Sequence, residues 1–192
     1  MKSNIRQPED NSLDFSAQFG QPVAPPALGE SQKEAIRQEA VRGTSSLKQK
    51  GYYIGISRRA VQRRTPRNGK SYSVLLVEDD AMIAKLLKHR LGSAGFEVAT
   101  AENRTEILKS FARTPLPDVV LLDVLLPDVN GFEVLAKLRA HPVLSTIPVV
   151  MLTGNASRED VLTGLMGGAD GYITKPFNLD RVVSVVQDVL GH

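Results

Sequence analysis

From Ser73 onward, short apolar runs alternate with longer segments in which apolar residues recur at helical spacing. The short runs predict strands at residues 73–77, 96–100, 119–123, 147–152 and 171–174. The longer segments predict helices at residues 81–91, after a cap at Asn103, and at 131–139, 158–165 and 179–190. Because strands that alternate with helices form parallel sheets with right-handed crossovers, we expect a doubly wound α/β domain over residues 73–192.

Residues 1–72 lack this pattern and differ in charge. They hold 13 Lys and Arg against 6 Asp and Glu, a net charge of +7, whereas residues 73–192 hold 11 and 15, a net charge of −4. The first 30 residues are polar, and the prolines at 21–26 can neither pair in a sheet nor continue a helix. A capping-box spacing predicts one short helix at 31–42. We therefore expect a largely disordered or weakly structured basic extension, or linker, over residues 1–72.

Positive charge is concentrated between residues 40 and 77, which contain nine Lys and Arg and no acidic residue. Tyr52 and Tyr53 lie inside this run. Basic residues interleaved with aromatic ones can bind nucleic acid or acidic surfaces. We favour a solvated basic tether, since no known DNA-binding motif accompanies the charges.

The amino-acid composition limits the cellular location of the protein and the kinds of chemistry that it can perform. The chain has no Cys, which excludes disulfides, a thiolate nucleophile and Cys-ligated metal and is compatible with a cytoplasmic location. No apolar run approaches the roughly 20 residues of a membrane span, and the N-terminus lacks the apolar segment of a signal peptide. We expect a cytoplasmic protein without membrane contact.

Polar side chains follow four of the five predicted strands. Glu78 and Asp79 follow the first strand, Asp123 ends the third, Thr153 follows the fourth and Lys175 follows the fifth. Because ligands bind at the carboxyl ends of parallel strands, these groups should share one pocket. Crowded carboxylates repel each other, and a hard cation such as Mg²⁺ relieves the repulsion. A cation, an ammonium and a hydroxyl around Asp123 would stabilise a phosphoryl group, so Asp123 is predicted as a nucleophile that forms an acyl phosphate.

Residues 73–192 closely resemble the receiver domain of two-component response regulators. The matching segments are LVEDD at 76–80, LLDVLLP at 121–127, NG at 130–131, VMLTG at 150–154, GADGY at 168–172 and TKPF at 174–177. The resemblance implies a flavodoxin-like fold, a five-stranded parallel sheet of order 2-1-3-4-5 with five helices. It also implies that Asp123 accepts phosphate from a phosphohistidine.

The resemblance implies a metal site as well. Asp79, Asp123 and the backbone carbonyl of Leu125 would ligate Mg²⁺ directly, and Glu78 would bind it through water. Glu78 stands where Asp is commoner in the family.

The phosphoryl oxygens would be bound by Thr153, Gly154 and Lys175. Tyr172 matches the aromatic switch residue, which turns inward when Thr153 moves toward the phosphate. If the extension senses phosphorylation, we expect the coupling to run through Thr153 and Tyr172 rather than through long-range charge.

The predicted function is a response regulator that accepts phosphate on Asp123 and switches its partner-binding surface. Its partners would be a sensor histidine kinase or histidine phosphotransfer protein and an unknown downstream protein. A metal-dependent phosphatase is disfavoured because Leu125 stands where such enzymes need a general acid, so we expect no enzymatic output beyond self-catalysed phosphotransfer and autodephosphorylation. The alternatives are an adaptor that binds nucleic acid through the basic arm under control of phosphorylation, or a receiver fragment of a larger regulator.

Overall fold

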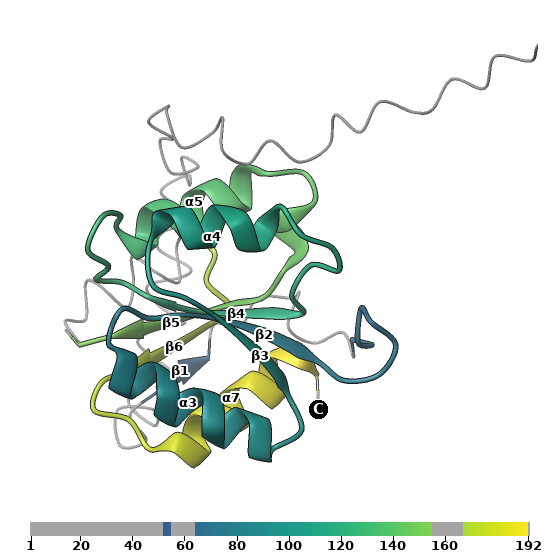
Figure 1. The fold of residues 1–192 in the computed structure, drawn as a ribbon, viewed down its shortest axis with the longest axis vertical. Helices are drawn as coiled ribbons and strands as arrows, with labels where there is room; N and C mark the ends of the chain where they lie inside the picture. The colour runs from purple at the N-terminus through teal and green to yellow at the C-terminus, as the bar shows by residue number, and fades with distance from the viewer. Residues whose placement is uncertain (1–51, 55–63, 155–166, 192) are drawn as a thin grey trace, which may run out of the picture.

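A computed structural model describes residues 52–54, 64–154 and 167–191 of the chain. The helices predicted at 31–42 and 158–165 lie outside these residues. In the described part, six strands form one sheet, and helices lie on both of its faces (Figure 1).

Five parallel strands make up most of the sheet. They follow the spatial order β3 (Glu97–Ala101), β2 (Ser73–Val77), β4 (Val119–Asp123), β5 (Val149–Thr153) and β6 (Gly171–Thr174). Numbered among themselves, these strands have the order 2-1-3-4-5, so the predicted flavodoxin-like topology is confirmed. The parallel order brings the carboxyl ends of β2, β4, β5 and β6 to the same edge of the sheet.

A sixth strand, β1 (Tyr52–Ile54), was not predicted. It pairs antiparallel with β6 at the edge of the sheet, with Tyr53 opposite Tyr172. It lies in the stretch that the sequence analysis assigns to a disordered or weakly structured extension. Three residues are too few to show a hydrophobic period, so its formation depends on the free edge of β6 rather than on a local pattern.

The helices cover the two faces of the sheet in pairs (Figure 1). Helices α3 (Ala81–Ser93) and α7 (Leu179–Leu190) lie on one face, and α4 (Arg104–Phe111) and α5 (Gly131–Ala140) on the other. A short 3₁₀ helix, η1 (Leu144–Thr146), precedes β5. An Asp or Asn side chain caps the first backbone N–H groups of each α-helix. Among the described residues, no helix has both the length and the apolar character needed to cross a membrane.

Two apolar cores sandwich the sheet, because successive side chains of a strand point to opposite faces. Leu75 and Val77 of β2 belong to the core under α4 and α5. Val74 and Leu76 belong to the core under α3 and α7. All residues of β4 and β5 are buried, which explains their unbroken apolar runs.

The segment before β2 is attached to the amino end of the sheet. The buried Asp118 carboxylate accepts the backbone N–H groups of Arg67 at 2.9 Å and Ser73 at 2.8 Å. Further back, the backbone N–H of Arg64 donates to the Leu190 carbonyl at 3.0 Å. The ordered contacts therefore begin before residue 73, where the sequence analysis expects the domain to start.

Candidate functional site

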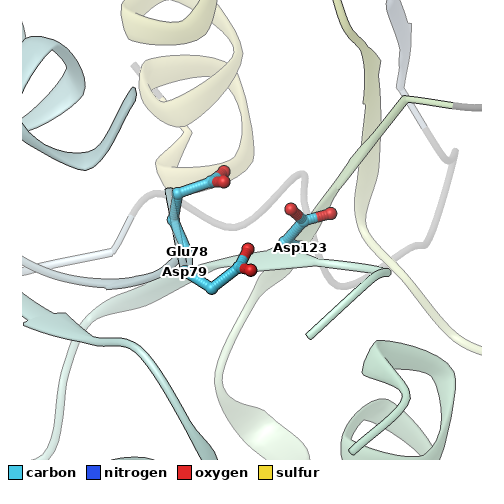
Figure 2. Close-up of side chains that lie close together, drawn as sticks. All are labelled: Glu78, Asp79 and Asp123. Atoms are coloured by element: carbon cyan, nitrogen blue, oxygen red, sulfur yellow. The ribbon is translucent and has the colours of Figure 1, made fainter. Parts of the chain in front are cut away.

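Three carboxylates meet where β2 and β4 end (Figure 2). Glu78 and Asp79 directly follow β2, and Asp123 is the last residue of β4. Oxygen atoms of the three side chains lie within 4.8 Å of one another. Glu78 and Asp123 are only 1% and 4% exposed, whereas Asp79 is exposed. The structure thus brings together the three acids that the sequence analysis assigns to the metal site.

Lys175 joins two of these acids. Its Nζ lies 2.7 Å from Oδ2 of Asp123, 2.8 Å from Oε1 of Glu78 and 2.7 Å from Oε2 of Glu78. Burial raises the pKa of Glu78, and the nearby Asp123 charge adds to this effect, although the Lys175 ammonium opposes it. Burial disfavours the charge on Lys175, but its hydrogen bonds to Asp123 and Glu78 outweigh burial and raise its pKa. Lys175 is therefore held charged between two acids that otherwise repel each other.

Thr153 and Gly154 lie at the end of the neighbouring strand. Thr153 is buried, and its carbonyl accepts the backbone N–H of Lys175 at 2.6 Å. Gly154 is exposed, and a Cβ atom placed on it would meet nothing within 4 Å. Space is therefore open beside Thr153 at the edge of the sheet where Asp123 ends.

Tyr172 lies within β6, three residues before Lys175, and is fully buried. Its side chain belongs to the core on the α4 and α5 face. Its backbone pairs with Met151 of β5 on one side and with Tyr53 of β1 on the other. The predicted switch residue is thus part of the strand that leads into the site.

The loop after Asp123 folds back on the site. The backbone N–H of Leu125 donates to Oδ1 of Asp123 at 3.2 Å, and Leu125 forms an isolated bridge with Asn130. The Leu125 side chain is 64% exposed and supplies no acidic group. Its backbone is next to the site, as the sequence analysis expects.

Asp80, the third acid of the run after β2, has a different role. Its side chain accepts the backbone N–H groups of Met82 at 2.8 Å and Ile83 at 3.0 Å and so caps α3. These hydrogen bonds lower the pKa of Asp80. The acid caps a helix, and Glu78 and Asp79 are left to face Asp123.

Gly131 is a positioning residue that the sequence analysis did not assign to the site. A Cβ atom at this position would lie 2.2 Å from the backbone oxygen of Asp123 and 2.9 Å from Cα of Val124. Its N–H donates to the Val124 carbonyl at 2.9 Å. The first residue of α5 therefore packs directly on the strand end that presents Asp123. The Asn-Gly pair at 130–131 is typical of a turn, but a turn by itself does not predict the close approach of Gly131 to the Asp123 backbone.

Replacing Gly131 with Ala should displace this strand end, since the obstructing atoms are backbone. We expect a loss of about 2 kcal/mol in the free energy of unfolding, within the range for overpacking. The matched control is Gly92→Ala in α3, where a Cβ atom meets nothing within 4 Å and should be neutral or slightly stabilising. Urea denaturation of the two variants checks the difference, and equal stabilities would contradict it.

Comparisons with known proteins agree with this arrangement. The response regulator receiver domain model matches residues 74–187. The transcriptional regulatory protein TrcR of Mycobacterium tuberculosis is 37% identical over 137 residues, which cover 69% of this chain and 52% of that protein. The DNA-binding response regulator MtrA of Mycobacterium leprae is 42% identical over 114 residues, covering 59% and 49%. The chain spans about half the length of these curated relatives.

Solved structures of response regulators also resemble this chain. A putative response regulator from Chloroflexus aurantiacus superposes with a TM-score of 0.60 and 34% identity, covering 64% of this chain and all of that chain. The chemotaxis protein CheY4 of Vibrio cholerae has a TM-score of 0.58 and 34% identity, covering 62% and 99%.

Receiver domains are phosphorylated on an aspartate, take the phosphoryl group from histidine kinases and regulate downstream effectors. They generally bind Mg²⁺ at an acidic pocket. The family match covers more than half of the chain, and the fold and acidic pocket agree with it. This chain therefore belongs to the response regulator receiver family of two-component systems.

Proposed function

We propose that Asp123 is the phosphoacceptor of this cytoplasmic receiver and that its donor is a phosphohistidine of a sensor histidine kinase or histidine phosphotransfer protein. The observation that supports this most directly is the Lys175 ammonium, 2.7 Å from Oδ2 of Asp123. In the transfer, a carboxylate oxygen of Asp123 attacks phosphorus. The bond from phosphorus to the imidazole nitrogen of the donor breaks, and its electron pair stays on that nitrogen. The product is an aspartyl phosphate.

The three acids fit a divalent cation. Glu78, Asp79 and Asp123 can each offer one oxygen within a 4.8 Å cluster, and Mg²⁺ prefers oxygen ligands while keeping several waters. Asp79 and Asp123 are the proposed direct ligands together with the Leu125 carbonyl, and Glu78 binds through water. When bound, the cation offsets the negative charge of the carboxylates and of the incoming phosphoryl group.

The remaining groups bind the phosphoryl oxygens. Lys175 already lies against Asp123 and can transfer its ammonium contact to a phosphoryl oxygen. The Thr153 hydroxyl and the backbone N–H of Gly154 are the further proposed donors. The open space at Gly154, where a Cβ atom would meet nothing within 4 Å, leaves room for a phosphoryl group beside Thr153.

The output of the domain is a changed surface rather than a released product. We propose that Thr153 and Tyr172 relay the phosphorylated state to a downstream protein. A metal-dependent phosphatase needs a general acid two residues after its nucleophile, and Leu125 at that position supplies none. The only hydrolysis that we expect is therefore autodephosphorylation of Asp123.

The test is to locate the phosphoryl group. Incubating the full chain with acetyl phosphate and Mg²⁺ should add one phosphoryl group by intact mass. Reduction of the aspartyl phosphate with borohydride then converts the modified residue to homoserine, which peptide mass spectrometry should find at position 123. Homoserine elsewhere, or an unmodified chain, would refute the assignment.

Replacing Asp79 with Ala should weaken Mg²⁺ binding at least tenfold, because an exposed carboxylate of the three-acid cluster is lost. Phosphorylation by acetyl phosphate should fall with it. The matched control is Asp188→Ala on the exposed side of α7, which should leave both unchanged. Titration calorimetry with Mg²⁺ gives the readout, and unchanged affinity in the Asp79 variant would show that the metal lies elsewhere.

A further inference from the structure

The outer edge of β6 is occupied by a segment of the same chain. β1 pairs antiparallel with β6 over three residues, Tyr52 with Ile173, Tyr53 with Tyr172 and Ile54 with Gly171. Without β1, the backbone groups of β6 on this side would form an open sheet edge, which readily accepts another strand. The basic extension thus contributes its own strand to the edge of the receiver (Figure 1).

β1 pairs with β6, the strand that directly precedes Lys175 in the site. β6 ends at Thr174, and the next residue, Lys175, donates its backbone N–H to Thr153 at 2.6 Å. The Lys175 ammonium then contacts Asp123 and Glu78. β6 therefore lies between β5 on one side and β1 on the other, and both pairings help to set the path of the backbone that leads to Lys175.

The short length of β1 should make its pairing with β6 reversible. A three-residue strand at an edge forms few hydrogen bonds and is marginal by itself. Arg64, which follows β1 by ten positions in the sequence, is itself attached to the domain. Its backbone N–H donates to the Leu190 carbonyl and its guanidinium to the Thr146 carbonyl, each at 3.0 Å. Because β1 is joined in sequence to the attached Arg64, it stays at a high effective concentration near β6 and can leave and return without being lost.

We propose that β1 is a displaceable edge strand that stabilises the unphosphorylated arrangement of β6, so that loading of Asp123 and release of β1 favour each other. The proposal rests on Asp123 being the phosphoacceptor. In the present arrangement the Lys175 ammonium is engaged with the carboxylates of Asp123 and Glu78. A phosphoryl group on Asp123 draws this ammonium to new oxygens, and any accompanying shift of β6 works against its pairing with β1.

Because coupling between two sites is reciprocal, the proposal has two independent readouts. Loading Asp123 must weaken the β1 pairing, and abolishing the β1 pairing must favour loading by up to the same factor, which is reached when the pairing is nearly complete in the unloaded parent. Coupling in proteins commonly amounts to roughly 5-fold to 150-fold in affinity, so we expect a change of at least about fivefold in each direction.

The first measurement is amide hydrogen exchange by NMR on the full chain, with and without beryllofluoride and Mg²⁺ as an acyl-phosphate mimic. We expect the protection of the paired amides in β1, and of their partners in β6, to fall about fivefold on loading. Amides of the central strand β4 serve as the internal control and should not lose protection. Unchanged or increased protection of β1 in the loaded protein would overturn the proposal.

The second measurement removes the pairing. Only alternate residues of an antiparallel strand direct their N–H toward the partner, so a double variant, Tyr52→Pro with Tyr53→Pro, eliminates a ladder donor whichever residue carries it. We expect this variant to bind beryllofluoride about fivefold more tightly than the parent chain. The control carries the same two prolines at Ser45 and Ser46, before the strand, and should behave like the parent.

The outcomes separate this proposal from the proposed function. A parent chain that binds no beryllofluoride and accepts no phosphoryl group refutes the phosphoacceptor assignment itself. A parent chain that loads normally, while the proline variant keeps its thermal unfolding transition and shows unchanged or weaker loading, refutes only the role of β1.

Discussion

Replacing Asp123 with Asn should abolish labelling by acetyl phosphate. The amide cannot act as the attacking oxyanion, and the site keeps its shape because the two side chains are nearly isosteric. Asp123 is buried, its Oδ2 lies 2.7 Å from Nζ of Lys175, and it is the last residue of the central strand β4. Intact mass spectrometry should therefore show no added phosphoryl group.

The matched control is Asp188→Asn, an exposed position on α7 remote from the carboxyl edge of the sheet. It should be labelled to the same extent as the parent. Normal labelling of the Asp123 variant would mean that another side chain accepts the phosphoryl group. The far-ultraviolet circular dichroism of both variants should match the parent, which separates a loss of chemistry from a loss of fold.

Replacing Lys175 with Met should produce the second large effect, because one ammonium serves both stability and transfer. Its removal leaves Glu78 and Asp123 buried and facing each other without a counter-charge. We expect a loss of about 3 kcal/mol in the free energy of unfolding at neutral pH without Mg²⁺, as for other buried pairs that lose a partner. We also expect phosphorylation to slow by roughly 100-fold, since a donor to the developing phosphoryl charge is absent.

The loss of stability in the Lys175 variant should depend on pH. Burial raises the pKa of Glu78 above its ordinary value, and loss of the ammonium raises it further. When the folded pKa of an acid is raised, the folded state binds more protons than the unfolded state as the pH falls, so acidification stabilises the folded state. The deficit relative to the parent should therefore be smaller at pH 5 than at pH 8.

In the parent, the stabilising charge of Lys175 is fully present below its unfolded pKa, near 10.5, and is lost as pH rises through its raised folded pKa. Urea denaturation of the parent and the variant, from pH 5 to above pH 10.5, is the measurement. Lys88→Met, at an exposed position on α3, is the control and should follow the parent at every pH. A deficit in the Lys175 variant that is independent of pH would contradict the electrostatic explanation.

Most of the secondary structure could be read from local patterns. The predicted strands 73–77, 119–123 and 171–174 and the helix 179–190 have the bounds found in the structure. Burial on both faces produces unbroken apolar runs, and a single apolar stripe produces helical spacing, so both features leave a trace in the sequence. The strand predicted at 147–152 instead covers Val149–Thr153. The Pro148 carbonyl still accepts the backbone N–H of Val120 at 2.9 Å, but Pro148 has no N–H with which to extend the ladder further back.

The acids and Lys175 could also be found from sequence, because parallel order alone sends the ends of successive strands to one edge. The contacts that these residues make could not be found from the sequence. Without the family resemblance, periodicity and chain order do not distinguish Asp80, which caps α3, from Asp79, which faces Asp123, since this depends on where the chain turns from strand to helix. Nor do they show that the Lys175 ammonium reaches both Glu78 and Asp123.

The order of strands and helices, the edge of the sheet that carries the chemistry and the candidate phosphoacceptor can therefore all be predicted from the amino-acid sequence. Each of these follows from periodicity and chain order, which are local properties. Two features are visible only in the folded chain: the close approach of Gly131 to the backbone of Asp123 and the addition of β1 to the edge of β6. The first joins a strand end to the helix that follows the next loop, and the second joins segments distant along the chain. Both depend on backbone positions in space, which no residue pattern in either segment encodes.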